Sequence, residues 1–210
     1  FNHPLLFAAA KMAAPLAAGN SVIIKPSEET PLSALWLAEI VGDIFPKGVL
    51  SVLTGGAELG ASICAHPGIA AVSLVGSVPT GKAVLKSAAD SMKRTQLELG
   101  GKNALIICPD ADLDAAINGA VKGMNLGWTA GQSCGSTSRI LVHSSVYDAV
   151  VEGIEAAFSA VKLGDPLSQD TEMGSLSTAS QFQRVTDYIA SAKQQGATIR
   201  VGAAPDHDDN

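Results

Sequence analysis

The stretch Ile69-Ala-Ala-Val-Ser-Leu-Val-Gly-Ser-Val-Pro-Thr-Gly81 decides the fold class of this chain. Its first half is a short apolar run, which predicts a buried β-strand. Gly76 and Ser77 end that run, and the following residues 79–89 begin with a proline and have a helical composition. A strand that turns through glycine into a helix is typical of the βαβ unit of a parallel sheet.

The same alternation of strand and helix continues in both directions. Helical spacing is clear over residues 31–45, where Thr30 and Pro31 predict an N-cap and a first helical residue. The alanine-rich run 7–18 predicts a buried helix. Further strands are predicted at 21–25, 49–53, 95–99, 103–108, 139–142 and 198–201, and further helices at 57–65, 113–127, 146–162 and 182–195. The pattern indicates an α/β fold with parallel strands.

The pair Gly100-Gly101 interrupts this pattern near the middle of the chain. A boundary there divides the sequence into two α/β lobes, residues 1–100 and 101–210. The tail 205–210 is polar and acidic, and we expect it to be mobile.

Composition excludes several classes of protein. The chain has 210 residues, 47% of them hydrophobic, so a sizeable core can form; its net charge of −6 does not suit a nucleic-acid partner. No apolar run approaches the roughly 20 residues that cross a bilayer. The three cysteines are widely spaced, which predicts neither a metal site nor a disulfide framework and favours a reducing, cytoplasmic compartment.

The loop Gly131-Gln-Ser-Cys-Gly-Ser-Thr-Ser-Arg139 contains one thiol, and its neighbours in the sequence are small or polar rather than apolar. A thiolate is a strong nucleophile towards carbonyl carbon, so Cys134 is a candidate catalytic residue; the alternative is a small buried side chain. For Cys64, in an apolar helix, and Cys108, at the end of a strand, we predict that buried role.

Glu98 and Asn2, which lie closer to the N-terminus, have side chains that could assist such a nucleophile. Alternation puts Glu98 on the opposite strand face from its two leucine neighbours, where it is either a general base or an exposed carboxylate. Asn2 is either a turn or N-cap residue or an amide donor to a developing oxyanion.

Signals for a bound dinucleotide are dispersed along the first lobe. Gly56 and Gly60 join a strand to a helix, as do Gly76, Ser77 and Gly81, and backbone N–H groups at such a junction favour phosphate. Neither segment matches Gly-x-Gly-x-x-Gly. The segment Lys25-Pro-Ser-Glu28 could hold ribose hydroxyls, or could be a solvated charge pair.

These motifs together resemble the NAD(P)-dependent aldehyde dehydrogenase superfamily. The resemblance covers residues 2–143 and continues more loosely to about residue 202. Its anchors are Phe1-Asn-His-Pro, Ile23-Ile-Lys-Pro-Ser-Glu, Phe45-Pro-Lys-Gly-Val-Leu, Val75-Gly-Ser, Leu97-Glu-Leu-Gly-Gly-Lys and Gly131-Gln-Ser-Cys.

The resemblance implies that Cys134 is the nucleophile, that Glu98 activates the deacylating water, and that Asn2 with the Cys134 backbone N–H forms the oxyanion hole. It also implies that His3 and Phe7 border the substrate tunnel and that Lys11 serves a proton path, although a core-facing helix surface explains these three equally well. The expected cofactor-binding residues are Lys25, Ser27, Glu28, Gly56, Gly60, Gly76, Ser77, Gly81, Leu99 and Gly100.

The resemblance implies an aldehyde dehydrogenase-like fold, with part of a Rossmann-type NAD(P)-binding domain at residues 1–100 and part of the α/β catalytic domain at 101–210. The expected activity is oxidation of an aldehyde through a cysteine thioester, with NAD favoured because Glu28 repels the 2′-phosphate of NADP. The family is about twice as long, and its Glu-x-Phe-Gly-Pro segment and subunit-joining strands have no counterpart here. We therefore expect a homo-oligomeric full-length enzyme and an inactive isolated segment. The alternatives are a cofactor-independent thiol acyltransferase or hydrolase, and an inactive structural remnant.

Overall fold

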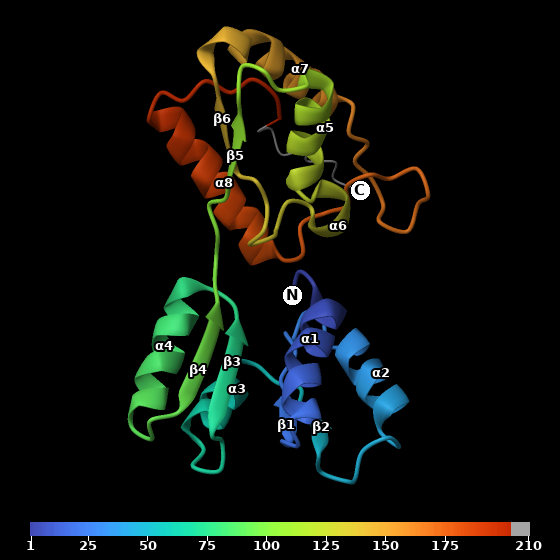
Figure 1. Cartoon of the computed structure of the whole chain (residues 1–210), viewed down its shortest axis with the longest axis vertical. Helices are drawn as coiled ribbons and strands as arrows, with labels where there is room; N and C mark the ends of the chain where they lie inside the picture. Colours follow the sequence, from blue (N-terminus) through green and yellow to red (C-terminus); the bar gives the residue numbers. More distant parts are fainter. Residues whose placement is uncertain (203–210) are drawn as a thin grey trace. The chain divides into compact units, whose positions relative to one another are not determined.

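The computed structural model describes residues 1–202, so the expectation for the tail 205–210 lies outside the described part of the chain. The chain divides into two compact units, Phe1–Gly100 and Gly101–Asn210 (Figure 1). Each unit is α/β, and all three strand pairs are parallel. The predicted fold class is confirmed by this architecture together with the structural relatives reported below.

The first unit is built from two consecutive βαβ units that follow an N-terminal helix. Its elements are α1 (Pro4–Ala17), β1 (Val22–Ile24), α2 (Leu32–Val41), β2 (Leu50–Val52), α3 (Ala57–Ala65), β3 (Ala71–Val75), α4 (Val78–Ala89) and β4 (Arg94–Glu98). β1 pairs with β2, and β3 pairs with β4. Figure 1 shows α4 beside the β3–β4 pair, with α1 and α2 beside β1–β2. The carboxyl ends of the strands in each pair therefore lie at one edge, where loops can gather functional side chains.

Alternation along β4 follows from the side-chain period of a strand. Thr95 and Leu97 are half-buried, while Glu98 is exposed. The buried Gly81 of α4 faces the side chains of Leu97 and Leu99, and a β-carbon on it would crowd Leu99. Glycine at this position lets the helix approach the strand closely, and the opposite face of β4 remains open for Glu98.

The second unit contains one βαβ unit followed by two longer helices. Its elements are β5 (Ala104–Ile107), α5 (Leu113–Gly123), α6 (Leu126–Thr129), β6 (Arg139–Val142), a 3-10 turn (Ser144–Val146), α7 (Tyr147–Ser159) and α8 (Ala179–Gln194). Ala120 on α5 and Val150 on α7 are fully buried, and these helices pack together beside the β5–β6 pair (Figure 1). The core of this unit therefore lies between α5, α7 and the strands.

Side-chain caps explain where several helices begin. The side-chain oxygens of Ser77, Asp112 and Thr178 accept hydrogen bonds from backbone N–H groups in the first turns of α4, α5 and α8. The predicted cap at Thr30 is wrong, because Pro31 is the N-cap of α2 and no side chain caps that helix. The Thr30 hydroxyl is instead buried and has no hydrogen-bond partner among residues 1–202.

The predicted helix 113–127 is wrong in one respect, because it breaks into α5 and α6. Asn125 between them is left-handed, with φ of 57°. The carbonyl oxygens of Gly123 and Met124 accept hydrogen bonds from Thr137 N and Ser136 Oγ. A distant loop therefore takes acceptors that a continuous helix would use internally.

Three further expectations are corrected by the structure. Residues 198–201 do not form a strand, because no neighbouring strand within the described residues pairs with this segment. Cys108 is exposed, since it lies just past the buried end of β5. The helix predicted at 7–18 forms, but it is only partly buried, with Ala8 and Met12 inside.

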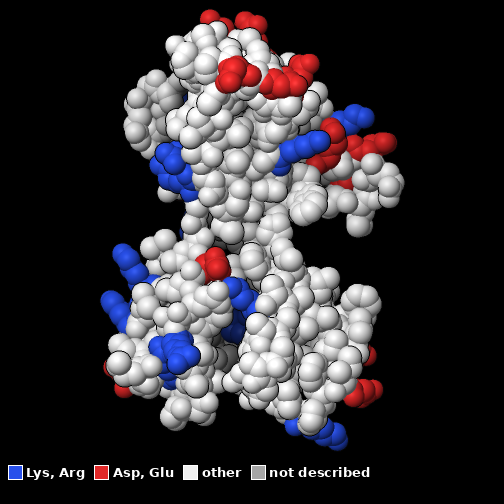
Figure 2. Space-filling model, in the orientation of Figure 1, with Lys and Arg blue, Asp and Glu red and all other residues white. Residues whose placement is uncertain are grey.

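Figure 2 shows Lys and Arg side chains dispersed over the visible face, without a continuous basic stripe. Acidic side chains gather at the end of the second unit that carries α7. The sequence of this helix includes Asp148, Glu152 and Glu155. Within residues 1–202, no helix is long and apolar enough to traverse a lipid bilayer. The same residues contain no cluster of three acidic, histidine or cysteine side chains that could hold a metal ion.

Candidate active site

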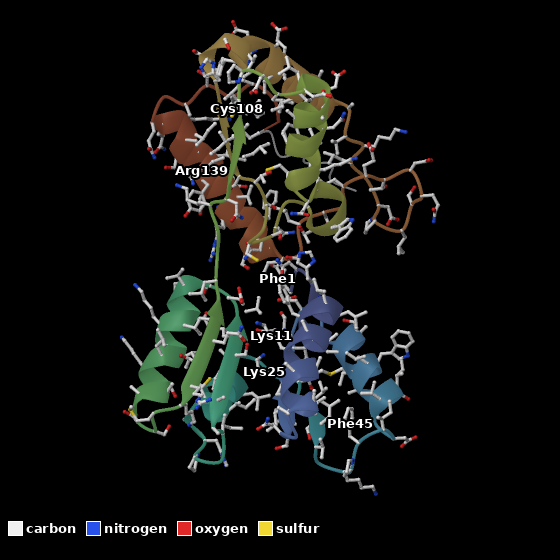
Figure 3. All side chains as sticks on the ribbon, viewed as in Figure 1. Phe1, Lys11, Lys25, Phe45, Cys108 and Arg139 are labelled. Carbon is white, nitrogen blue, oxygen red and sulfur yellow. The ribbon has the colours of Figure 1, made fainter. Side chains whose placement is uncertain are left out.

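Cys134 lies in the loop of residues 131–138, called the cysteine loop below, which connects α6 to β6. Its side chain is partly exposed, whereas Cys64 on α3 is buried and Cys108 is exposed. Burial raises the pKa of the Cys64 thiol, which lowers its thiolate fraction at any given pH. Cys108 follows the carboxyl end of β5, and Arg139 begins the parallel strand β6, so the two lie at opposite ends of this sheet (Figure 3).

The cysteine loop is anchored by a buried hydroxyl. Ser136 is only 4% exposed, and its Oγ donates towards the carbonyl oxygens of Met124, at 2.9 Å, and Gly131, at 3.4 Å. The backbone N–H of Thr137 donates to Gly123 O at 2.9 Å. These bonds fasten the loop to the break between α5 and α6, which explains why the break and the loop occur together.

Gln132 connects the cysteine loop to the segment before α8. Its Nε2 donates to Thr129 O at 2.9 Å, and its Oε1 accepts from the hydroxyl of Ser177 at 2.9 Å and from the Ser177 backbone N–H at 3.3 Å. Both ends of the Gln132 amide are therefore used within the second unit.

Glu98 ends β4 in the first unit, opposite Val75 in the parallel register. Its carboxylate is 50% exposed and forms an ion pair with the Lys11 ammonium of α1 at 3.7 Å. Gly76 donates its N–H to Glu98 O at 3.0 Å, so the turn that follows β3 lies beside this residue. The structure thus places Glu98 at the carboxyl edge of the sheet on a solvent-accessible face.

Asn2 lies one residue before the N-cap of α1, which is His3. His3, Phe7 and Lys11 share one face of this helix: the His3 and Phe7 rings meet edge to face at 5.8 Å, and Lys11 lies one turn beyond Phe7, beside Glu98. Figure 3 shows Lys11 on α1 and Lys25 past the end of β1, both within the first unit. Asn2 is partly buried there.

Lys25 and the glycines after β2 come together because β1 and β2 are parallel and in register at Ile24 and Val52. The Lys25 ammonium donates to Gly55 O at 2.6 Å and to Pro26 O at 3.0 Å, and lies 3.6 Å from the Glu28 carboxylate. The side-chain carbons of Lys25 also lie close to Gly60 on α3. A backbone N–H donated to Glu28, together with the Lys25 charge, lowers the pKa of this exposed carboxyl.

The remaining candidate cofactor-binding residues lie around the ends of the first-unit strands. Ser27 Oγ accepts from Glu29 N at 3.3 Å. Gly56 is the N-cap of α3, and a β-carbon there, or at Gly100, would meet no atom within 4 Å. Gly76 and Ser77 lead into the 12-residue helix α4, so the positive end of its helix dipole faces this edge, although the Thr80 N–H already donates to Ser77 Oγ. Open backbone at a helix start is the geometry that a phosphate needs.

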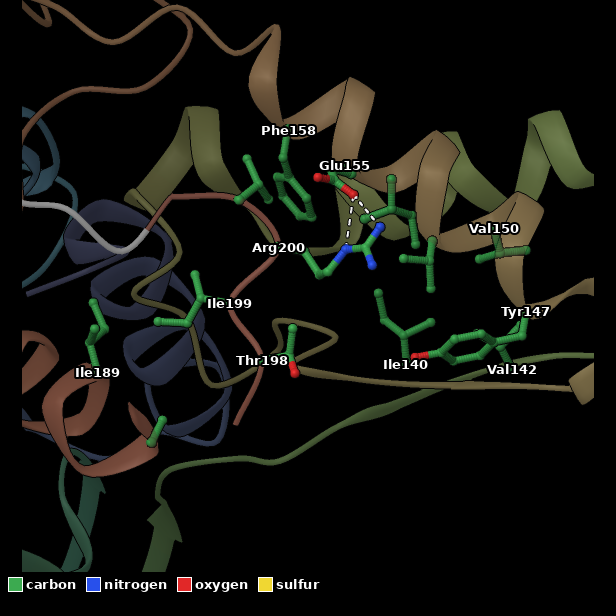
Figure 4. Close-up of a pocket in the computed structure, with 14 residues that line it drawn as sticks. Ile140, Val142, Tyr147, Val150, Glu155, Phe158, Ile189, Thr198, Ile199 and Arg200 are labelled. Atoms are coloured by element: carbon green, nitrogen blue, oxygen red, sulfur yellow. Dashed lines mark hydrogen bonds and ion pairs between the residues drawn. The ribbon is translucent and has the colours of Figure 1, made fainter. Parts of the chain in front are cut away.

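The candidate residues thus form one group in each unit. Asn2, Glu98 and the expected cofactor-binding residues belong to the first unit, and Cys134 belongs to the second. A separate apolar groove of about 470 Å³ lies between α7, β6 and the segment 198–201 (Figure 4). There Arg200 donates two hydrogen bonds to Glu155, at 2.9 and 3.1 Å. None of the candidate active-site residues lines this groove.

A family model described as the aldehyde dehydrogenase family matches residues 1–210. The chain belongs to the aldehyde dehydrogenase family. It is 49% identical over 205 residues to the aldehyde dehydrogenase tropH of Talaromyces stipitatus, covering 96% of this chain and 39% of that protein. It is 42% identical over 203 residues to a betaine aldehyde dehydrogenase of Mesorhizobium japonicum, covering 96% of this chain and 41% of that protein.

Solved structures of aldehyde dehydrogenases have the same fold over this region. A betaine aldehyde dehydrogenase variant from Staphylococcus aureus, in complex with NAD⁺ and with a cysteine modified by BME, gives a TM-score of 0.93 at 39% identity. That match covers 99% of this chain and 43% of the other. An NAD⁺ complex of an aldehyde dehydrogenase from Bacillus cereus gives 0.92 at 41% identity, covering 96% and 41%. The chain thus spans about two fifths of the length of these relatives.

Sequence reasoning missed the residues that hold the cysteine loop of this aldehyde dehydrogenase chain. Asn103 Nδ2 donates to Cys134 O at 2.6 Å and to Ser136 O at 3.0 Å. A signal was present, because parallel pairing of β5 (Ala104–Ile107) with β6 (Arg139–Val142) brings the residues that precede each strand side by side. Asn103 and Ser136 are polar residues at those positions.

Proposed function

We propose that the full-length protein oxidises an aldehyde to a carboxylic acid with NAD⁺, using Cys134 as a covalent nucleophile. The observation that supports this most strongly is the cysteine loop, which presents a partly exposed thiol in a chain of the aldehyde dehydrogenase family. A solved relative carries a cysteine modified by BME, so at least one thiol of that protein is reactive. In this proposal residues 1–100 belong to the cofactor-binding domain and 101–210 to the catalytic domain.

The residues of the first unit suit the proposed cofactor. The exposed Glu28 carboxylate and the Lys25 ammonium offer an acceptor and a donor for ribose hydroxyls, while the open backbone at Gly56 and the positive helix dipole at the start of α4 favour a phosphate. Lys25 uses two of its three N–H groups on Gly55 O and Pro26 O and lies 3.6 Å from Glu28, so one N–H remains to donate to a ribose hydroxyl. When bound, NAD⁺ supplies the hydride acceptor that makes the reaction an oxidation.

The chain's own residues account for the remaining chemistry. The Cys134 thiolate forms a C–S bond to the aldehyde carbon, and the carbonyl oxygen becomes an oxyanion. The Asn2 amide and the Cys134 backbone N–H donate to that oxyanion. After oxidation leaves a thioester, Glu98 accepts a proton from water, the water oxygen bonds to the acyl carbon, and the C–S bond breaks to release the acid and the thiolate.

The proposal extends to the setting of the enzyme. Three free thiols support a reducing, cytoplasmic compartment. Exposed apolar side chains on α2, including Leu32, Trp36 and Ile40, support a homo-oligomer. We expect the isolated 210-residue segment to aggregate and to have little or no dehydrogenase activity.

Replacing Cys134 by alanine in the full-length protein tests the proposal. Aldehyde- and NAD⁺-dependent absorbance at 340 nm should fall by about 10³-fold or more, because no other group replaces the nucleophile. Cys108→Ala is the matched control in the same unit and should retain activity. Full activity in Cys134→Ala would overturn the mechanism. If the parent protein hydrolyses esters without added nucleotide and does not bind NAD⁺, a thiol hydrolase is favoured instead.

Replacing Glu28 by glutamine tests the cofactor preference. The lowered pKa keeps this carboxylate ionised at neutral pH, where it repels a 2′-phosphate. Glu28→Gln should therefore reduce the preference for NAD⁺ over NADP⁺ in kcat/KM by about tenfold, equivalent to about 1.4 kcal/mol. The exposed neighbour Glu29→Gln serves as the control. An unchanged ratio in Glu28→Gln would show that other residues set the preference.

A further inference from the structure

The residues just before β5 contact the backbone of the cysteine loop. Ala104 pairs with Arg139 in the parallel register, so Asn103 lies beside the residues that precede β6. Its backbone oxygen accepts from Arg139 N at 3.1 Å. We propose that Asn103 and Gly101 form a clamp that positions Cys134. This inference rests on the proposed function of Cys134 as the nucleophile.

Asn103 uses both N–H groups of its amide on this loop. One hydrogen bond goes to Cys134 O at 2.6 Å and the other to Ser136 O at 3.0 Å, so two carbonyls on the C-terminal side of Cys134 are fixed. On the N-terminal side, the Gln132 amide fixes the loop to Thr129 and Ser177. With the backbone held on both sides, the main freedom left to the thiol is rotation between staggered χ1 states.

Gly101 makes room for the same carbonyl. A β-carbon on Gly101 would collide with Cys134 O and would lie 3.1 Å from Asn103 Nδ2. Gly101 is not among the residues with positive φ, so space rather than backbone conformation requires glycine here. The collision is with backbone, which cannot move aside as a flexible side chain can. Any larger residue at 101 must therefore push Cys134 O away from the Asn103 amide.

The clamp acts on geometry more than on folding. Asn103 is exposed, and hydrogen bonds in exposed loops contribute little to overall stability. Catalysis is far more sensitive, because a displacement of about 1 Å at the nucleophile can cost roughly 10²-fold in rate. Loss of the clamp should therefore lower kcat while leaving substrate binding and the folded core nearly unchanged.

The test compares Asn103→Asp and Gly101→Ala with the control Gly119→Ala in the full-length protein. Asp keeps the size of Asn103 but loses both N–H donors, and Gly101→Ala keeps the donors but displaces the acceptor. Gly119 lies exposed on α5, and an added β-carbon there would meet no atom within 4 Å. Both test variants should lower kcat by about 10- to 100-fold, with the KM for aldehyde and for NAD⁺ within about threefold of the parent value.

Amide hydrogen exchange provides a second readout that needs no catalytic activity. Exchange in peptides covering 131–138 should become about tenfold faster in both variants, while peptides from α5 and α7 keep the parental rate. Wild-type kcat with unchanged loop exchange would overturn the inference. So would variants in which KM changes as much as kcat and exchange in α5 and α7 accelerates as much as exchange in the loop. A parent protein without aldehyde-dependent activity would refute the proposed function. The exchange measurement would still show whether Asn103 and Gly101 hold the cysteine loop in place.

Discussion

The cysteine loop and the end of β4 hold their candidate catalytic side chains in opposite ways. The loop around Cys134 is fixed by the amides of Asn103 and Gln132 and by the buried hydroxyl of Ser136. Glu98 instead lies at an exposed strand end, where its carboxylate forms an ion pair with Lys11. A nucleophile must meet the substrate in one geometry, whereas a base that activates water after acylation can tolerate a looser position. The contrast suits the two proposed roles.

The strongest challenge to this contrast is Glu98→Gln. If Glu98 activates water only after acylation, its loss should lower steady-state turnover by about 10²- to 10⁴-fold and leave the first, acylating turnover intact. Rapid mixing at 340 nm separates the initial burst from the steady state. Glu39→Gln, on the exposed side of α2, is the control and should behave like the parent. A burst that disappears along with turnover would place Glu98 in acylation instead.

Ser136→Ala tests whether the cysteine loop is held by its buried hydroxyl. The change leaves Met124 O without this donor in a buried site, which should lower the free energy of unfolding by about 1 to 3 kcal/mol. The urea midpoint measures the effect. Ser138→Ala, two residues on and exposed, should leave it unchanged. Equal midpoints in the two variants would mean that Ser136 does not anchor the loop.

Lys11→Met should have the smallest effect. Lys11 Nζ lies 3.7 Å from Glu98 Oε1, and the Glu98 side chain is half exposed. Such exposed ion pairs contribute about 0 to 1 kcal/mol to the free energy of unfolding. Turnover should therefore change by no more than about fivefold across the pH profile. A loss above about 10²-fold would mean that Lys11 takes part in proton transfer itself and that Glu98 is held more tightly than the contact indicates.

The local sequence pattern predicted those helices and strands whose formation depends on neighbouring residues in the chain. Apolar runs and glycine turns identified strands β1 to β6, and α3 occupies the predicted residues, Ala57–Ala65. The segment 198–201 has the composition of a strand but no partner strand within the described residues, and Arg200 bonds to Glu155 instead. Strand formation depends on a neighbour, which a single segment does not reveal.

Long-range hydrogen bonds explain what sequence reasoning missed at the site. The break at Asn125 depends on Ser136 and Thr137, which occupy the carbonyls of Met124 and Gly123. Likewise, Asn103 finds its acceptors 31 and 33 residues further along the chain. The proposed roles of Cys134 and Glu98 come from residue type and motif, but the groups that hold the cysteine loop come from elsewhere in the fold.

Trapping the acyl enzyme tests the central claim most directly. Glu98→Gln full-length protein is incubated with an aldehyde and NAD⁺, digested, and examined by peptide mass spectrometry. We expect the peptide containing Cys134 to gain the mass of the acyl group, while the peptides of Cys64 and Cys108 stay unmodified. An adduct on either of those cysteines, or turnover with no adduct on Cys134, would contradict it.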